Sequence, residues 1–336
     1  MEIGLITFPS ADGSANTARM AEGLGFDSLA FADTQNLTPE VWGQLMLAAA
    51  ATDRIQLGPG VTNPVTRDPA VTASAAIALQ LASAGRAVLG IGRGDSSMAK
   101  IGRRPASPAV LDRYLEQLRA YLHGETVDRD GTPSRLEWLD ALTVEPVPIE
   151  VAATGPKVIE IAARRVDRIA FAVGADAQRL AECRELARRA AEQAGRDPDA
   201  LRYGAYVNCV VHPDVAVARE AARGGVSVFA HFSGFRGMDI SSLPAGVREA
   251  ARHLRENYDM AHHGSGAGAH AQALAPDFIE RFAIVGPVED VHRRFAELGE
   301  TGIDFVRIVG GSRDMPAGVG AESIQTIAKE IAPRLR

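Results

Sequence analysis

Residues 55–64 read Ile-Gln-Leu-Gly-Pro-Gly-Val-Thr-Asn-Pro, and residues 86–95 read Arg-Ala-Val-Leu-Gly-Ile-Gly-Arg-Gly-Asp. Each segment is a short apolar run that ends in glycines and polar residues, and a helix-like run of small residues separates them. Strand, helix and strand in this order form the unit of a parallel α/β sheet. In a parallel barrel the ligand site lies at the carboxyl ends of the strands, so these ends are the first candidate site.

The same alternation of strand and helix continues along the chain. The expected strands are 2–8, 27–32, 54–61, 86–92, 149–153, 168–173, 203–212 and 303–309. The expected helices are 14–24, 39–51, 69–82, 108–122, 156–165, 177–194, 214–229 and 321–331. Eight strands that alternate with eight helices predict an α/β fold of the (β/α)₈ (TIM) barrel type, formed by residues 1–336 as one domain.

Three expected helix starts place a capping side chain directly before proline: Thr38-Pro39, Asp68-Pro69 and Ser107-Pro108. Such a side chain accepts a backbone N–H, and proline loses nothing at the first helical position. Two insertions interrupt the rhythm, at about 123–147, where a hairpin is expected, and at about 232–286, which reads as irregular. Long irregular segments are often functional or mobile loops.

The composition is that of an ordinary soluble globular protein, with 46% hydrophobic and 23% charged residues. The net charge of −6 argues against a nucleic-acid partner, and no apolar run is long enough to cross a bilayer. Cys183 and Cys209 have neither metal-site nor disulfide-framework spacing, so we expect packing residues and no metal. With no charged start typical of a signal peptide at residues 1–8, we expect a cytoplasmic protein.

Motifs along nearly the whole chain resemble one family in order. They are Leu24–Asp27, Gly58–Pro64, Arg86–Asp95, Ala152–Lys157, Phe282–Asp290 and Gly302–Asp304. Together they resemble the luciferase-like superfamily of flavin and deazaflavin oxidoreductases, and most nearly its methylene-tetrahydromethanopterin reductase branch. The resemblance implies hydride transfer between coenzyme F420, a deazaflavin, and a small organic substrate that the sequence does not identify.

The resemblance also implies which residues bind the ring of the cofactor. Gly60 and Val61 match the position of a non-proline cis peptide behind the central ring, and Thr62, Asn63 and Gly92 are expected beside it. Without the resemblance, the glycines around Gly60 would fit a simple bulge or a tight strand end.

A second group of residues suits the phosphate of the cofactor. Thr154, Gly155 and Lys157 open an expected helix, whose free N–H groups and dipole attract an anion. Gly174 and Ala175 form a second turn after the next strand. A plain helix cap at Thr154 is the alternative. No G-x-G-x-x-G dinucleotide loop is present in register.

Polar residues at two other strand ends are candidates to face the substrate. Asp33 and Thr34 follow the second strand, where many deazaflavin relatives carry Asp-His, so Thr34 replaces the histidine. Asp33 is expected to orient a neighbour. Asp95 follows the fourth strand and is the best acid or base candidate, with a loop-capping role as the alternative.

Histidines and arginines near the expected strand ends have ambiguous roles. His262, His263 and His270 match no metal spacing, so solvated loop residues are expected, with contact to substrate as the alternative. Arg307 and Arg313 lie near the end of the eighth strand and are expected either to steer an anion or to be solvated.

Two other functions remain open from the sequence. With FMN as cofactor, the protein would be a monooxygenase that receives reduced flavin from a partner reductase. A barrel that binds flavin without turnover is the third possibility, because a fold alone does not determine function. Relatives in the superfamily are commonly dimers or tetramers, so a homo-oligomer is expected.

Overall fold

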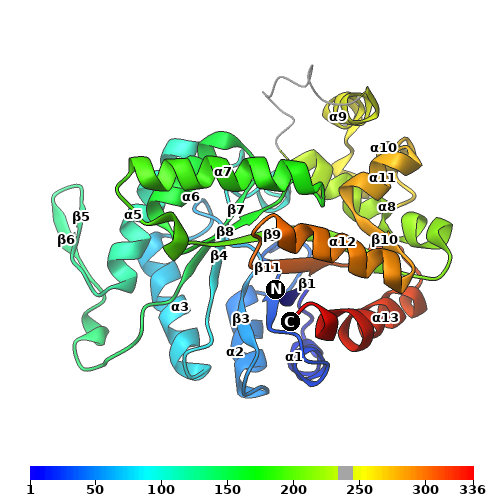
Figure 1. The fold of residues 1–336 in the computed structure, drawn as a ribbon. Helices are drawn as coiled ribbons and strands as arrows, with labels where there is room; N and C mark the ends of the chain where they lie inside the picture. Colours follow the sequence, from blue (N-terminus) through cyan, green and yellow to red (C-terminus); the bar gives the residue numbers. More distant parts are fainter. Residues whose placement is uncertain (234–244) are drawn as a thin grey trace.

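The computed structural model describes residues 1–233 and 245–336, and its centre is a parallel barrel (Figure 1). The barrel strands are β1 (Glu2–Thr7), β2 (Ser28–Phe31), β3 (Gln56–Pro59), β4 (Leu89–Ile91), β7 (Ile149–Ala153), β8 (Arg168–Phe171), β9 (Arg202–Val211) and β11 (Phe305–Val309). They pair in the order β3-β2-β1-β11-β9-β8-β7-β4. Bridges Leu57–Ala87 and Thr62–Ile91 connect the two ends, so the predicted (β/α)₈ barrel is confirmed and nearly closed.

Helices cover the outside of the barrel (Figure 1). They are α1 (Ser14–Gly23), α2 (Val41–Ala50), α3 (Pro69–Ala82), α4 (Ser96–Ala99), α5 (Pro108–Leu122), α6 (Pro156–Arg165), α7 (Ala177–Gln193), α8 (Val215–Phe232), α9 (Ala245–Asn257), α10 (Ala269–Gln272), α11 (Pro276–Phe282), α12 (Val288–Glu300) and α13 (Ala317–Thr326). The sequence predicts neither the short α4 nor α12. The last helix begins at Ala317, earlier than expected.

Two of the three predicted helix caps are confirmed. The Asp68 carboxylate accepts from the N–H of Ala70, and the Ser107 hydroxyl accepts from that of Val110. The prediction at Thr38 is wrong, because α2 begins at Val41 and Glu40 caps it. The Thr38 hydroxyl instead donates to carbonyls of the preceding turn, so Thr38 belongs to that turn.

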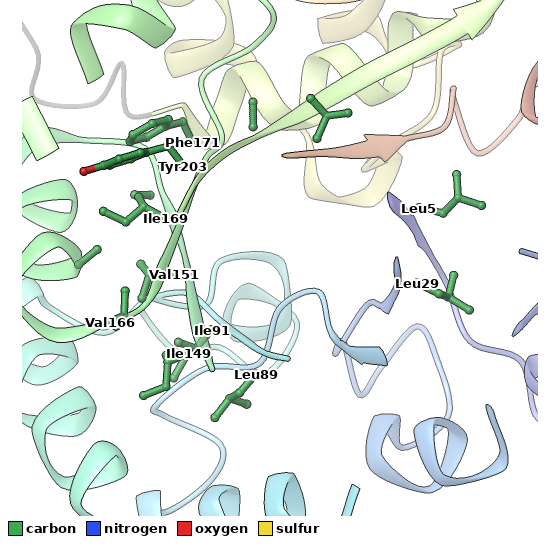
Figure 2. Close-up of a cluster of buried hydrophobic side chains, with 14 of the residues drawn as sticks. Leu5, Leu29, Leu89, Ile91, Ile149, Val151, Val166, Ile169, Phe171 and Tyr203 are labelled. Atoms are coloured by element: carbon green, nitrogen blue, oxygen red, sulfur yellow. The ribbon is translucent and has the colours of Figure 1, made fainter. Parts of the chain in front are cut away.

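Alternate strand residues face opposite sides of the barrel wall, as the period of two requires. Outward-facing residues such as Val151, Ile169 and Phe171 are buried against the helices and form the main core (Figure 2). Full burial of one such side chain contributes about 1.5–3 kcal/mol. Inward-facing Ala170 and Tyr206 belong to a separate cluster inside the barrel.

A buried ionic cluster fills the barrel interior toward the amino ends of the strands. Arg307 Nη2 and Arg168 Nε lie 2.7 and 3.1 Å from Glu150 Oε2, and all three side chains are at most 5% exposed. Burial by itself raises the pKa of Glu150, but the two guanidinium groups bring that pKa below its ordinary value. The prediction that Arg307 is solvated or steers a ligand at the mouth is therefore wrong.

The two insertions in the alternation of strands and helices, at about 123–147 and 232–286, fold differently. In the first, β5 (Val127–Arg129) pairs antiparallel with β6 (Thr132–Ser134), which confirms the hairpin. In the second, the described residues form α9, α10 and α11, so irregular structure is the wrong prediction for them. Their apolar residues pack on α8, which stabilises helices too short to give a clear periodic pattern. Strand β10 (Ile284–Gly286) then pairs with the far end of β9.

The two ends of the chain meet beside the barrel (Figure 1). The amino group of Met1 donates to the carbonyl oxygen of Leu335 at 2.9 Å. Within residues 1–233 and 245–336, no helix combines the length and apolar character that a membrane span needs.

Candidate functional site

A cavity of about 290 Å³ opens at the carboxyl ends of the barrel strands. Residues from strand ends, from α8 and from the segment before α10 line it. The predicted site residues among them are Asp33, Thr34, Gly60, Val61, Gly92, Asp95 and Thr154. The structure thus brings the two glycine-rich strand ends and the start of α6 to a single cavity.

The Gly60-Val61 peptide bond is cis, as the resemblance implies. Glycines around it allow close approach of backbone segments. A Cβ at Gly58 would overlap the carbonyl group of Val88, and one at Gly60 would lie 2.8 Å from the side chains of Ala30 and Ile6. The absence of a side chain at Gly58 lets β3 approach the residue that precedes β4, and its absence at Gly60 leaves room for the inward side chains of β1 and β2.

Small and apolar residues that face inward form the floor of the cavity. Ile6, Ala152, Ala172 and Tyr206 line it together with Val61. They form the interior layer above the ionic cluster, and none carries a charge. An apolar floor with a polar rim is the type of surface that holds a ring system.

Thr62 and Asn63 are fully buried behind the cavity wall rather than among its lining residues. The N–H of Thr62 donates to the Gly90 carbonyl, which connects the ends of β3 and β4. Asn63 Oδ1 accepts from the N–H groups of Val65 and Thr66, both at 3.0 Å. The two residues shape the loop that carries the cis peptide, and direct contact with a cofactor stays a prediction.

The start of α6 has the properties of an anion site. Gly155 is the N-cap and has no side-chain cap, so the plain cap at Thr154 is not what the structure contains. Thr154 lines the cavity, and Lys157 is exposed in the first turn of the helix. Pro156 has no N–H, and the N–H groups of Val158 and Ile159 donate to the Gly155 carbonyl. A phosphate at the edge of the cavity would therefore bind the N–H groups of Gly155 and Lys157 together with the Thr154 hydroxyl.

The second predicted phosphate turn is partly engaged by the protein. Gly174 has φ +88°, and a Cβ there would lie 2.7 Å from the ring of Phe282. The N–H of Ala175 donates to the Phe282 carbonyl at 2.8 Å. A phosphate contact from Ala175 would therefore need another group, and the role of this turn stays a prediction.

Asp33 is a buried carboxyl group in the cavity wall. Burial raises its pKa, while the Thr62 hydroxyl and the Arg67 guanidinium act in the opposite direction. Arg67 Nε lies 3.9 Å from Asp33 Oδ2, which is too long for a hydrogen bond. Thr34 is also buried beside the cavity, whereas Gln35, which follows it, is exposed.

Asp95 precedes α4, and its side chain does not cap that helix. The carboxylate is half-buried and lines the cavity. Asp95 therefore does not cap α4, and both its acid or base role and its loop-capping alternative stay predictions.

Sequence reasoning missed three lining residues, Tyr206, Phe229 and Phe232, and it named His263 only as an alternative to a solvated loop residue. The alternation in β9 could have identified Tyr206 as inward-facing, and a longer expected helix after β9 could have included Phe232. No local signal identifies His263, because its burial depends on packing between remote segments.

His262, His263 and His270 were expected to be solvated, and this holds only for His262. His263 and His270 are 7% and 1% exposed, while His262 is exposed and pairs with Asp259 at 2.6 Å. Burial lowers the pKa of His263 to about 4, with smaller contributions from neighbouring cations. Among the described residues no cluster of three or more His, Cys, Asp or Glu side chains could hold a metal.

Residues 6–304 match the family model described as luciferase-like monooxygenase. A 5,10-methylenetetrahydromethanopterin reductase from Archaeoglobus fulgidus is 32% identical over 95% of this chain and 94% of its own length. The solved coenzyme F420-dependent tetrahydromethanopterin reductase from Methanopyrus kandleri covers all of this chain and 99% of its own, with TM-score 0.77 and 23% identity. An F420-dependent secondary alcohol dehydrogenase, solved with an F420-acetone adduct, gives TM-score 0.75, 20% identity and coverage of 100% and 99%.

Proposed function

The chain belongs to the luciferase-like monooxygenase family, and on this premise we propose that it transfers a hydride between coenzyme F420 and a small organic substrate. One observation carries the proposal. A single cavity joins the apolar floor at Gly60-Val61 to the start of α6 at Thr154. A planar ring with an anionic tail needs both features in this arrangement.

The residues present fit such a cofactor. The floor residues Val61, Ala152 and Ala172 are small and apolar, which leaves room for a tricyclic ring. The uncapped N-terminus of α6 offers backbone N–H donors beside Thr154, and these suit a phosphate. Relatives with F420 in their names, at 20–23% identity over the whole chain, support the choice of this deazaflavin.

F420, when bound, supplies two-electron hydride chemistry, and the chain supplies binding, orientation and exclusion of water. Val61 and Tyr206 would support the ring from below, and Thr154 would bind the tail. Asp95 is proposed as the group that moves a proton at the substrate, and Asp33 and Thr34 as groups that orient it. Thr62 and Asn63 would hold the loop behind the ring.

An FMN-dependent monooxygenase fed by a partner reductase is the second candidate. One observation favours it. Thr34 stands where many deazaflavin relatives carry histidine, so the usual polar partner of the deazaflavin reaction is missing at that position. A barrel that binds flavin without turnover is the third candidate.

One experiment separates the three candidates. The purified protein is titrated with oxidised F420 and with FMN, each followed by visible absorption and fluorescence, and reduced cofactor is then mixed with candidate substrates with and without oxygen. Tight F420 binding with hydride exchange is the expected result. Tight binding of reduced FMN with oxygen uptake would replace the proposal by the monooxygenase. Binding without turnover would support the third candidate, and binding of neither cofactor would reject the site.

We also propose a cytoplasmic homo-oligomer. Large apolar side chains are exposed on the neighbouring helices α2 and α3, namely Met46, Leu47, Val71 and Leu81. Exposed apolar side chains on two packed helices offer a candidate surface for a protein interface. Light scattering of wild type against Leu47→Glu tests this proposal, because a charge in the interface should shift the mass toward the monomer.

A further inference from the structure

A row of aromatic rings leads from the barrel interior to the segment before α10. Tyr206 stacks on Phe229 with centroids 5.9 Å apart, Phe229 contacts Phe232 at 6.2 Å, and Phe232 contacts His263 at 5.8 Å. All four residues line the cavity. The row therefore forms one continuous wall, and His263 is the polar ring in it that is farthest from the barrel.

The backbone around His263 is held by the loop after β11. Arg313 Nη1 donates to the His263 carbonyl at 3.2 Å, and the Arg313 N–H donates to the carbonyl of Gly264 at 2.8 Å. The Asp314 carboxylate accepts from the Ser265 hydroxyl at 2.6 Å. Bonds to a separate part of the chain thus fix the position of the imidazole ring.

Tyr258 is hydrogen-bonded to this ring. Its hydroxyl lies 2.7 Å from His263 Nδ1, and its ring stacks on His231 with centroids 3.9 Å apart. Burial raises the pKa of Tyr258, so the phenol keeps its proton and needs an acceptor. Among the described residues Nδ1 is the partner found for that proton. With the phenol as the donor of this bond, the imidazole proton resides on Nε2, which becomes a neutral donor for a ligand.

The surroundings of this donor suit a neutral and largely apolar molecule. Phe8, Leu37 and Val228 line the cavity together with the aromatic row. Two carboxylates, those of Asp33 and Asp95, line it as well and would repel an anion. Arg93 is the one lysine or arginine among the lining residues, and its Nε donates to the Ala106 carbonyl, so carboxylates outnumber such cations in the lining by two to one.

We propose that the Nε2–H of His263 binds the carbonyl oxygen of a neutral, largely apolar substrate, and that Tyr258 is a positioning residue for this bond. The inference rests on the proposed function and names its substrate class. In that reaction the carbonyl carbon gains the hydride lost by reduced F420, and the C=O π pair moves to oxygen. Asp95, the proposed proton carrier, passes a proton to that oxygen and regains one from water, which yields the alcohol.

The first test needs no cofactor. In protein with ¹⁵N-labelled histidine, the His263 signals are assigned by their loss in His263→Gln. We expect a ring protonated at Nε2 in the wild type, a mixture of tautomers in Tyr258→Phe, and a shift of the Nε2 signal when cyclohexanone is added. A wild-type ring protonated at Nδ1, or no shift with saturating cyclohexanone, would overturn the proposal.

The second test uses three matched probes on the F420 complex, read by the absorption of bound oxidised F420. They are cyclohexanone, methylenecyclohexane, which lacks the oxygen, and cyclohexanecarboxylate, which is an anion. His263→Phe should weaken cyclohexanone binding about fivefold to tenfold and leave methylenecyclohexane unchanged, because one hydrogen bond between neutral groups is lost. His263→Gln should retain part of the affinity, and His262→Phe, at an exposed position, is the matched control.

Two results of the second test would refute the inference: equal losses for cyclohexanone and methylenecyclohexane in His263→Phe, or tightest binding of the carboxylate to the wild type. Failure of F420 to bind would instead refute the proposed function. The first test still measures the ¹⁵N signals of the His263 ring in that case. Failure of the inference and failure of the proposed function can therefore be distinguished.

Discussion

Replacing His263 with glutamine should remove a large part of the acid sensitivity of this protein. The pKa of the buried imidazole is lowered from 6.5 to about 4, first by burial and then by nearby cations such as His231. Above pH 6.5 the ring is neutral in the folded and the unfolded chain. As the pH falls from 6.5 toward 4, the unfolded chain binds a proton that the folded chain does not, so stability is lost in this window.

The magnitude follows from the two pKa values. Between pH 7 and pH 5 the unfolded ring becomes almost fully protonated while the folded ring stays mostly neutral. With 6.5 for the unfolded and about 4 for the folded state, this one residue costs about 2 kcal/mol over that range. His263→Gln has no such proton, so its free energy of unfolding should fall by about 2 kcal/mol less than that of the wild type.

The assay is urea unfolding followed by circular dichroism at pH 7 and pH 5. Wild type, His263→Gln and the control His123→Gln are compared, and His123 is exposed at the end of α5. The control should follow the wild type. Equal pH dependence of wild type and His263→Gln would refute the reasoning, since it would mean that the ring protonates as easily in the folded chain as in water.

Gly60→Ala should lower the free energy of unfolding by about 1–3 kcal/mol in urea titrations, because its Cβ would lie 2.8 Å from two side chains of the wall; unchanged stability would contradict the close packing. Glu150→Gln should cost about 3–5 kcal/mol in the same assay, since the buried charge of Arg307 loses its partner, and a neutral effect would show that the cluster is hydrated. Burial raises the pKa of Asp33, so Asp33→Asn should be more stable than wild type at pH 8, and the difference should shrink as the pH falls toward 3.8 and stay constant below it; a stability difference that is the same at pH 8 and pH 4 would contradict the raised pKa. Asp95→Ala should lower turnover by about a hundredfold or more with nearly unchanged F420 affinity, and an unaffected rate would remove Asp95 from the proton transfer.

The alternation of apolar runs with helical segments was sufficient to predict the barrel. Strands such as β7 and helices such as α3 and α6 begin and end where local signals place them, because capping side chains and prolines act within a few residues. The cis bond at Gly60-Val61 was implied by the resemblance, whose motif covers both residues. The sequence also placed Asp33, Asp95 and Thr154 at strand ends, which a parallel barrel collects at one end.

Only the tertiary structure decided which polar residues face the cavity and which are buried elsewhere. Arg307 was expected near the mouth of the barrel but is paired with Glu150 in the barrel interior. His263 was expected in solvent but lines the cavity. Glu150 is 157 residues from Arg307 in the chain, and Arg313 is 50 residues from His263. Local sequence determines backbone conformation through short-range sterics and capping. The environment of a charge or a ring depends on partners that only the folded chain brings within hydrogen-bonding distance.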